Sequence, residues 1–176
     1  AIKNAITPNT KAIVPVHLFG LAANMDEIMK LANEHNLFVI EDNAQGIGGY
    51  YASKDGTKKK TGTIGHVAST SFFPSKNLGC FGDGGAISTN NKELGNRIKA
   101  IANHGMHRRY YHDAIGVNSR LDSLQAAVLN IKLPLLNQYS GARTKAATFY
   151  TEEFKNVPEI ETPVISSFSS HVFHQY

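Results

Sequence analysis

The feature that most constrains this chain is a strand, helix and strand pattern at its start. The run KAIVPVHLFG (residues 11–20) is apolar, rich in β-branched residues and closed by a glycine, which predicts a buried strand. Residues 24–35 begin with the polar NMDE and then carry apolar side chains at helical spacing, and LFVIED (residues 37–42) is a second apolar run. Such a unit joins parallel strands by a right-handed crossover. The sequence therefore predicts an α/β sheet.

Later segments continue this alternation. The predicted strands are 66–73 and 84–90, and the predicted helices are 92–103, 120–133 (ending before Pro134) and 137–156. Two stretches lack such periodicity. Residues 50–65 are rich in Lys, Gly, Thr and Ser and are predicted to form an exposed loop, whereas residues 104–119 are predicted to be irregular.

Composition argues against several classes of protein. With 41% hydrophobic and 18% charged residues the chain fits a soluble globular protein, and its longest apolar runs fall far short of the ~20 residues of a membrane helix. The single Cys80 cannot form an internal disulfide, and no Cys and His pair shows zinc-finger spacing. We therefore expect a cytoplasmic protein with no metal site. Several of the lysines behind the net charge of +4 lie in residues 54–60, which gives little support for nucleic-acid binding.

Two residues that could carry chemistry follow predicted strands. Asp42 ends the run LFVIED, and Lys76 lies in the loop SFFPSKNLG between two strands. A lysine in such a loop is most often a solvated surface charge. Together, however, the two supply what pyridoxal phosphate (PLP) needs, namely an amine for a Schiff base and a carboxylate that keeps the pyridine nitrogen protonated. Because ligands bind at the carboxyl ends of strands in open α/β sheets, one crevice could hold both.

Four motifs in a fixed order carry a resemblance to a known family. They are VPVHLFG, EDNAQ, SFFPSKNLG followed by GDGG, and GVNSRLDSLQAA. Over nearly its whole length the chain resembles the DegT/DnrJ/StrS family of sugar aminotransferases. The resemblance implies the PLP-dependent transferase fold of aspartate aminotransferase (fold type I), with a mostly parallel sheet flanked by helices. Residues 1–136 would be part of the PLP-binding large domain, and 137–176 a connecting helix and the start of a small C-terminal domain.

The resemblance also assigns roles to individual residues. In the family, the aspartate of EDxAQ pairs with the pyridine nitrogen and the glutamine lies by the ring face and phenolic oxygen, which implies Asp42 and Gln45 here. The SFxxxK motif implies Lys76 as the Schiff-base lysine and Ser71 as a hydroxyl for the cofactor phosphate. Each has a simpler interpretation as well: Asp42 could cap the next segment, Gln45 could be a turn residue, and Ser71 could satisfy its own backbone.

The last motif implies residues that reach a second subunit. In GxNxR, Asn118 would contact the cofactor phosphate across a dimer interface, and Arg120 would lie near the substrate. Arg120 is predicted to open a helix, where a cation is unfavourable unless an anion compensates it, and this favours a role in the site. His17, at the end of its strand, is interpreted as a core histidine with satisfied hydrogen bonds.

The resulting hypothesis is a PLP-dependent aminotransferase that moves an amino group from L-glutamate to a nucleotide-linked keto sugar. The loop SFFPSKNLG, with Pro74 two residues before Lys76, resembles that of members that aminate C3. The pathway stays open between cell-surface polysaccharide and antibiotic sugars. The chain begins with Ala1 rather than Met and ends in HVFHQY, so we expect a central portion of a longer protein. Alone it is expected to be inactive, because the helix N-terminus that holds the phosphate would precede Ala1.

Other functions fit the residues less well. A non-catalytic regulatory or assembly paralogue of the same fold is the main alternative, although intact Asp42 and Lys76 weigh against it. A dehydratase relative has histidine in place of this lysine. A nicotinamide-binding domain would require GxGxxG, which GDGGA does not match.

Overall fold

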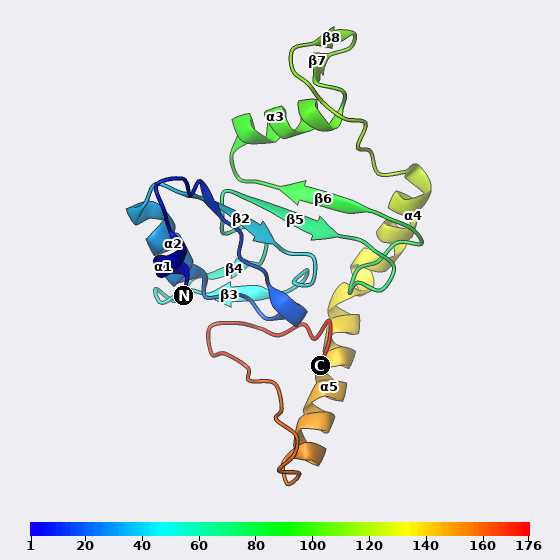
Figure 1. Cartoon of the computed structure of the whole chain (residues 1–176). Coiled ribbons are helices and arrows are strands. Elements are labelled where there is room, and N and C mark those ends of the chain that lie inside the picture. Colours follow the sequence, from blue (N-terminus) through cyan, green and yellow to red (C-terminus); the bar gives the residue numbers. More distant parts are fainter.

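A four-stranded mixed sheet organises the computed structural model, which describes residues 1–176 (Figure 1). Its strands are, in spatial order, β1 (Ala12–Ile13), β2 (Phe38–Asp42), β5 (Val67–Ser71) and β6 (Gly85–Ser88). The first three strands are parallel, and β6 runs antiparallel to β5. The expected α/β architecture with a mostly parallel sheet is therefore confirmed.

Helix α2 (Met25–Glu34), which is the helix of the predicted strand, helix and strand unit, covers one face of β2. It begins at the cap Asn24, whose side chain accepts a hydrogen bond from the Glu27 N–H, and it packs its apolar stripe against the sheet. The shared core consists of Ala22, Met25, Ile28, Ala32, Leu37, Val39 and Tyr51. A short helix, α1 (Ile2–Ala5), precedes this unit.

The first strand is shorter than predicted. Only Ala12–Ile13 pairs regularly with β2, although Val16 forms a further isolated bridge to Asp42. Pro15 has no N–H to donate to a sheet ladder, which limits the regular pairing. The chain then turns through a 3₁₀ helix, η1 (Leu18–Gly20), in which Phe19 adopts a φ of 55°.

The later helices lie outside the sheet. They are α3 (Lys92–Ala102), α4 (Ser123–Lys132), the 3₁₀ turn η2 (Leu133–Leu135) and α5 (Leu136–Phe154). Helix α3 lies beyond β6, and α4 and α5 lie past the ends of the strands (Figure 1). Pro134 occupies the first turn of η2, so it does not interrupt the path from α4 to α5. The helix predicted from Arg120 begins only at Ser123, after Asp122. No helix combines the length and the apolar character needed to cross a bilayer.

Both stretches predicted to lack regular structure form hairpins. Residues 50–65 contain the antiparallel pair β3 (Tyr50–Ala52) and β4 (Lys58–Lys60), and residues 104–119 contain β7 (Met106–Arg108) and β8 (Tyr111–His112). In the first hairpin Tyr51 is buried in the core while the three lysines of β4 face solvent. The second hairpin projects beyond α3, away from the sheet (Figure 1).

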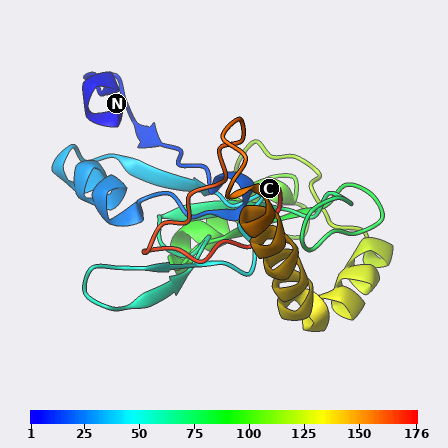
Figure 2. The same cartoon turned by 90° about the horizontal axis from the view of Figure 1, so that it is seen from below.

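The C-terminal segment returns from the end of α5 and runs between that helix and the β3–β4 hairpin (Figures 1 and 2). The Ala52 N–H donates to the Phe168 carbonyl at 2.7 Å, and the Val172 N–H donates to the Gly20 carbonyl at 3.0 Å. The segment therefore attaches to η1 and to β3 by backbone hydrogen bonds.

Two glycines make a matched test of this attachment. Gly20 has a φ of 100°, and an added Cβ would lie 2.7 Å from Val172 Cγ2, so Gly20→Ala should lower the free energy of unfolding by roughly 1–3 kcal/mol. Gly141 lies inside α5 in open space, so Gly141→Ala should raise it by about 0.5–1 kcal/mol. Urea unfolding measures both, and a Gly20→Ala protein as stable as the wild type would contradict the close packing described.

Candidate functional site

Asp42 is the last residue of β2 and is fixed from both neighbouring strands. Its N–H donates to the Pro15 carbonyl at 2.8 Å, its carbonyl accepts from the His17 N–H at 3.0 Å, and its register partner in β5 is Ser69. The half-buried carboxylate accepts one hydrogen bond, at Oδ1 from the Ala44 N–H at 3.0 Å. The other carboxylate oxygen is free to accept a hydrogen bond from a ligand.

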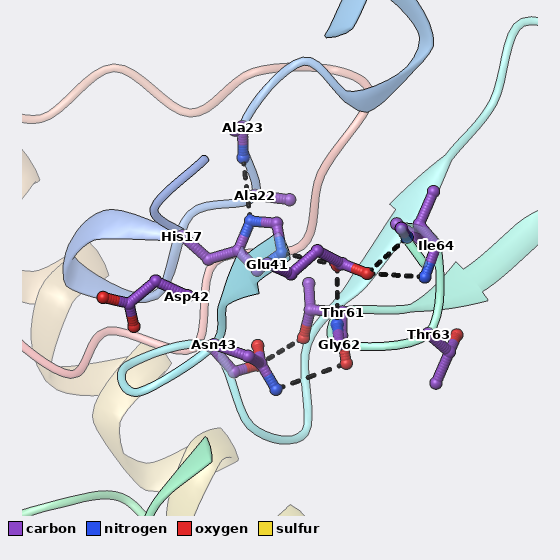
Figure 3. A network of polar contacts seen from close by, with 12 residues as sticks. His17, Ala22, Ala23, Glu41, Asp42, Asn43, Thr61, Gly62, Thr63 and Ile64 are labelled. Carbon is purple, nitrogen blue, oxygen red and sulfur yellow. Dashed lines mark hydrogen bonds and ion pairs between the residues drawn. The ribbon is translucent and has the colours of Figure 1, made fainter. Parts of the chain in front are cut away.

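The residue before it, Glu41, points to the opposite face of the sheet and is fully buried (Figure 3). Its carboxylate accepts from His17 Nε2 and the Gly62 N–H, each at 2.8 Å, and from the N–H groups of Ile64 at 2.7 Å and Gly65 at 2.6 Å. Burial alone would raise the pKa of Glu41, but these hydrogen bonds outweigh it, so the pKa lies below its ordinary value. Glu41 is therefore ionised at neutral pH.

The second ring nitrogen of His17 decides the protonation of this pair. Nδ1 accepts a hydrogen bond from the Ala23 N–H at 3.2 Å, so it carries no proton, and the proton of the ring lies on Nε2 and is donated to Glu41 (Figure 3). The contact is therefore a hydrogen bond between a neutral imidazole and a carboxylate. His17 is fully buried with both nitrogens paired, as the sequence predicts for a core histidine.

Gln45 follows β2 in the same turn as Asp42. Its Oε1 accepts a hydrogen bond from the Phe19 N–H at 2.5 Å, which ties the turn after β2 to η1. The amide NH₂ of Gln45 makes no hydrogen bond within the chain, so it can donate to a ligand. Between the two residues, buried Asn43 donates to the Thr61 carbonyl and to Thr70 Oγ1, both at 3.3 Å.

Lys76 lies in a tight loop after β5. Its backbone N–H donates to the Phe73 carbonyl at 2.9 Å, and a Cβ on Gly79 would lie 2.5 Å from the Pro74 carbonyl oxygen. The half-buried side chain takes part in none of the three ion pairs of the chain. It borders a cavity of about 520 Å³ that also has Lys132 and Arg143 in its wall.

The cationic surroundings of this cavity affect a histidine of the C-terminal segment. Burial lowers the pKa of His174 below its ordinary value, and the positive charges of Lys76 and Arg143 lower it further. Lys132 Nζ donates to the Gly79 carbonyl, and Arg143 donates to the carbonyls of Phe173 and His174, each at 3.2 Å. Lys76 is thus the cation here whose amine has no partner within the chain.

Ser71 ends β5 opposite Gly85 of β6. Its hydroxyl oxygen accepts a hydrogen bond from the Phe73 N–H at 3.2 Å, which is the local backbone contact that serine favours at the end of a strand. The hydroxyl proton remains available for a second partner. Ser71 is half-buried, at the start of the loop that carries Lys76.

Asn118 and Arg120 lie in an exposed segment between the second hairpin and α4. The segment is anchored to the end of α3, where the Ser119 N–H donates to the Ala102 carbonyl at 2.9 Å. Arg120 Nε donates to Asn118 Oδ1 at 2.9 Å, and Arg120 borders a cavity of about 670 Å³ beside β5 and β6. Because Arg120 precedes the helix, the argument from a helix dipole does not apply to it.

Asn77 is a connecting residue that the sequence did not single out. It is buried next to Lys76, donates from Nδ2 to the Val172 carbonyl at 2.9 Å, and its Oδ1 lies 3.2 Å from His174 Nδ1. Its partners are distant in sequence, so no local pattern could reveal the contact. Glu41 carried a local signal, because it is an ionisable residue at the end of an apolar strand.

Comparison with known proteins places this geometry in context. An aminotransferase of Pseudomonas aeruginosa, UDP-2-acetamido-2-deoxy-3-oxo-D-glucuronate aminotransferase, is 48% identical over 175 residues, which are 99% of this chain and 47% of that protein. The structure of DesV of S. venezuelae in complex with a ketimine intermediate matches 98% of this chain and 45% of its own, with a TM-score of 0.92 and 42% identity. The structure of NtdA of Bacillus subtilis with its bound cofactor PMP matches 98% of this chain and 39% of its own, with a TM-score of 0.82 and 35% identity.

The chain spans about half the length of the relatives it matches. Over that length the likeness extends to the fold, which is that of part of a PLP aminotransferase with a mixed, mostly parallel sheet. The model of the DegT/DnrJ/EryC1/StrS aminotransferase family matches residues 1–176, the whole of the sequence. The chain therefore belongs to the DegT/DnrJ/EryC1/StrS aminotransferase family.

Proposed function

We propose that this protein is a PLP-dependent aminotransferase that transfers an amino group to a nucleotide-linked keto sugar. One observation carries the proposal. β2 and β5 are hydrogen-bonded parallel neighbours. Asp42, whose carboxylate has a free oxygen, ends β2, and Lys76, whose amine has no partner within the chain, lies in the loop after β5. Parallel neighbours bring their carboxyl ends to the same edge of the sheet, where open α/β sheets bind ligands.

The donor groups of these residues fit PLP. Asp42 offers an acceptor for a protonated pyridine nitrogen, Gln45 offers an amide donor, and Lys76 offers an unpaired amine. The Ser71 hydroxyl can donate to a phosphate oxygen. The set contains an anion, a neutral donor and a primary amine, which match the protonated ring nitrogen, the phenolic oxygen and the aldehyde of this cofactor.

Each residue then has a separate task. Bound PLP supplies an electron sink for the negative charge that develops on the carbon of the amino donor. Asp42 keeps a proton on the pyridine nitrogen by accepting a hydrogen bond from it, and Gln45 donates to the oxygen beside the ring. Lys76 holds the cofactor covalently at rest, and its released amine takes and returns a proton as a general base and acid.

The remaining assignments concern the complete protein. We propose L-glutamate as the amino donor, C3 of the sugar as the acceptor position, and the cytoplasm as the setting. The P. aeruginosa relative, which is named for a 3-oxo sugar, supports C3. Residues 1–136 are proposed to belong to the large domain and 137–176 to lead into the small one. We also propose a homodimer in which Asn118 and Arg120 serve the partner's site, a state that sedimentation of the full-length protein tests.

The covalent role of Lys76 gives the first test. Borohydride treatment of the full-length, PLP-loaded protein should leave a pyridoxyl group on Lys76, because reduction makes the link to the amine permanent. Peptide mass spectrometry locates the group. Lys76→Ala should carry no label, whereas Lys92→Ala, which removes an exposed lysine of α3, should be labelled like the wild type. A label on another lysine would contradict the assignment.

The charge of Asp42 gives the second test. Asp42→Asn should still bind PLP, but its transamination rate should fall by roughly 10²- to 10⁴-fold, because a neutral amide cannot hold the proton on the pyridine nitrogen. Asp55→Asn changes an exposed carboxylate in the β3–β4 hairpin and should leave the rate unchanged. Steady-state rates of the two loaded proteins decide the matter. Near-normal turnover of Asp42→Asn would mean that another group protonates the ring.

A further inference from the structure

We propose that His17 and Glu41 are positioning residues for the cofactor site. They are buried behind it and set the turn η1, on which Gln45 and the loop of Lys76 both depend. The inference rests on the proposed function, since it concerns where the prospective cofactor residues lie.

His17 and Glu41 join the two backbone segments that hold Asp42. The chain near the end of β1 bonds to Asp42 by two backbone hydrogen bonds, to the Pro15 carbonyl and from the His17 N–H. The side chains of His17 and Glu41 add a third link between the same two segments, at 2.8 Å and shielded from water. Figure 3 shows the Asp42 carboxylate pointing away from this pair. The pair therefore fixes the backbone of Asp42 without touching a ligand on its other side.

His17 is linked to Gln45 through the turn η1. His17 Nδ1 accepts from the Ala23 N–H, and the His17 carbonyl accepts from the Gly20 N–H at 3.3 Å, so the ring and its backbone close the turn from both ends. Within that turn Phe19 is held at a φ of 55°, which is uncommon for a residue other than glycine. This conformation presents the Phe19 N–H to Gln45 Oε1. Loss of the closure would release the donor that orients Gln45.

The turn η1 is linked to the loop of Lys76 through the C-terminal segment. The carbonyls of Phe19 and Gly20 accept from the N–H groups of His174 at 2.9 Å and Val172 at 3.0 Å. The Val172 carbonyl in turn accepts from the side chain of Asn77, the residue after Lys76. The path from η1 to the lysine loop therefore consists of residues 172–174 of the C-terminal segment and the buried side-chain amide of Asn77.

The pair needs a carboxylate at residue 41 because of the number of N–H groups that surround it. Glu41 receives four N–H donors, three of them from the backbone of residues 62–65 that leads into β5. A glutamine there would turn an NH₂ group toward at least one of these donors, leaving it unpaired in the core. The ionised carboxylate thus holds β1, β2 and the approach to β5 together.

Variants at His17 separate positioning from general stability. His17→Gln keeps a donor and an acceptor on a side chain of similar reach, whereas His17→Asn is too short to serve both partners. Ile28→Ala is the matched control, because it opens a cavity in the apolar core under α2 and contacts none of these groups. All three are compared with the wild type as full-length proteins.

Three readouts are measured, namely kcat, visible circular dichroism and amide NMR signals, and the fraction of bound PLP is determined for each protein. In the PLP-loaded proteins, His17→Asn should lower kcat roughly 10- to 100-fold and change the visible circular dichroism of the bound cofactor, since displacements of about 1 Å can cost that much. His17→Gln should recover most of both, and Ile28→Ala should change neither. In the proteins without PLP, His17→Asn should shift the NMR signals of the Phe19 N–H and the Gln45 side-chain amide, which Ile28→Ala should leave in place.

The outcomes distinguish the two levels of the proposal. Wild-type kcat, circular dichroism and amide signals in His17→Asn would show that the pair serves stability alone and would overturn the inference. A wild-type protein that does not bind PLP would overturn the proposed function, while the amide signals would still decide whether His17 positions Gln45. If His17→Asn fails to fold, Glu41→Gln takes its place, and wild-type kcat, circular dichroism and amide signals in a folded Glu41→Gln protein would equally overturn the inference.

Discussion

The buried carboxylate of Glu41 is the interaction on which the rest of the site depends. An ion this deep in the core costs several kcal/mol of solvation unless hydrogen bonds replace the water it loses. Here the replacement comes from four N–H donors in two separate segments: one from His17, which follows β1, and three from residues 62–65, which precede β5. The carboxylate is therefore stable only when these segments have taken their final positions. This links the order of the sheet to the placement of the residue that follows it, Asp42.

Much of the fold could be predicted from the sequence, because most of its strands and helices have apolar residues at the periodicity typical of their type. β2, β5, β6, α2 and α3 lie where apolar runs and spacing place them. The β3–β4 hairpin could not be predicted in this way, since its burial depends on distant partners. Tyr51 packs against Phe168 of the C-terminal segment, with ring centroids 5.5 Å apart. The short length of β1, in contrast, has a local cause, because Pro15 follows the regularly paired residues and has no N–H to donate.

The residues of the site likewise fall into those that local sequence could predict and those that it could not. Asp42 ends a predicted strand and Lys76 follows one, so both could be predicted as candidate site residues from the strands alone. The protonation of His17 and the bridge through Asn77 depend on contacts between residues far apart in sequence, which no spacing rule contains. Asn118 and Arg120 hydrogen-bond to each other but to neither Asp42 nor Lys76 within one chain, which agrees with the proposal that they act across a subunit boundary.

Measuring the protonation state of His17 tests the central claim most directly, because its ring joins the Glu41 carboxylate to the Ala23 N–H. Two-bond ¹H–¹⁵N correlation spectra of the histidine side chains at neutral pH can distinguish the possible states. We expect a neutral ring with its proton on Nε2 and an unprotonated Nδ1. A ring protonated on Nδ1, or an imidazolium, would leave the Ala23 N–H without its acceptor and would contradict the account.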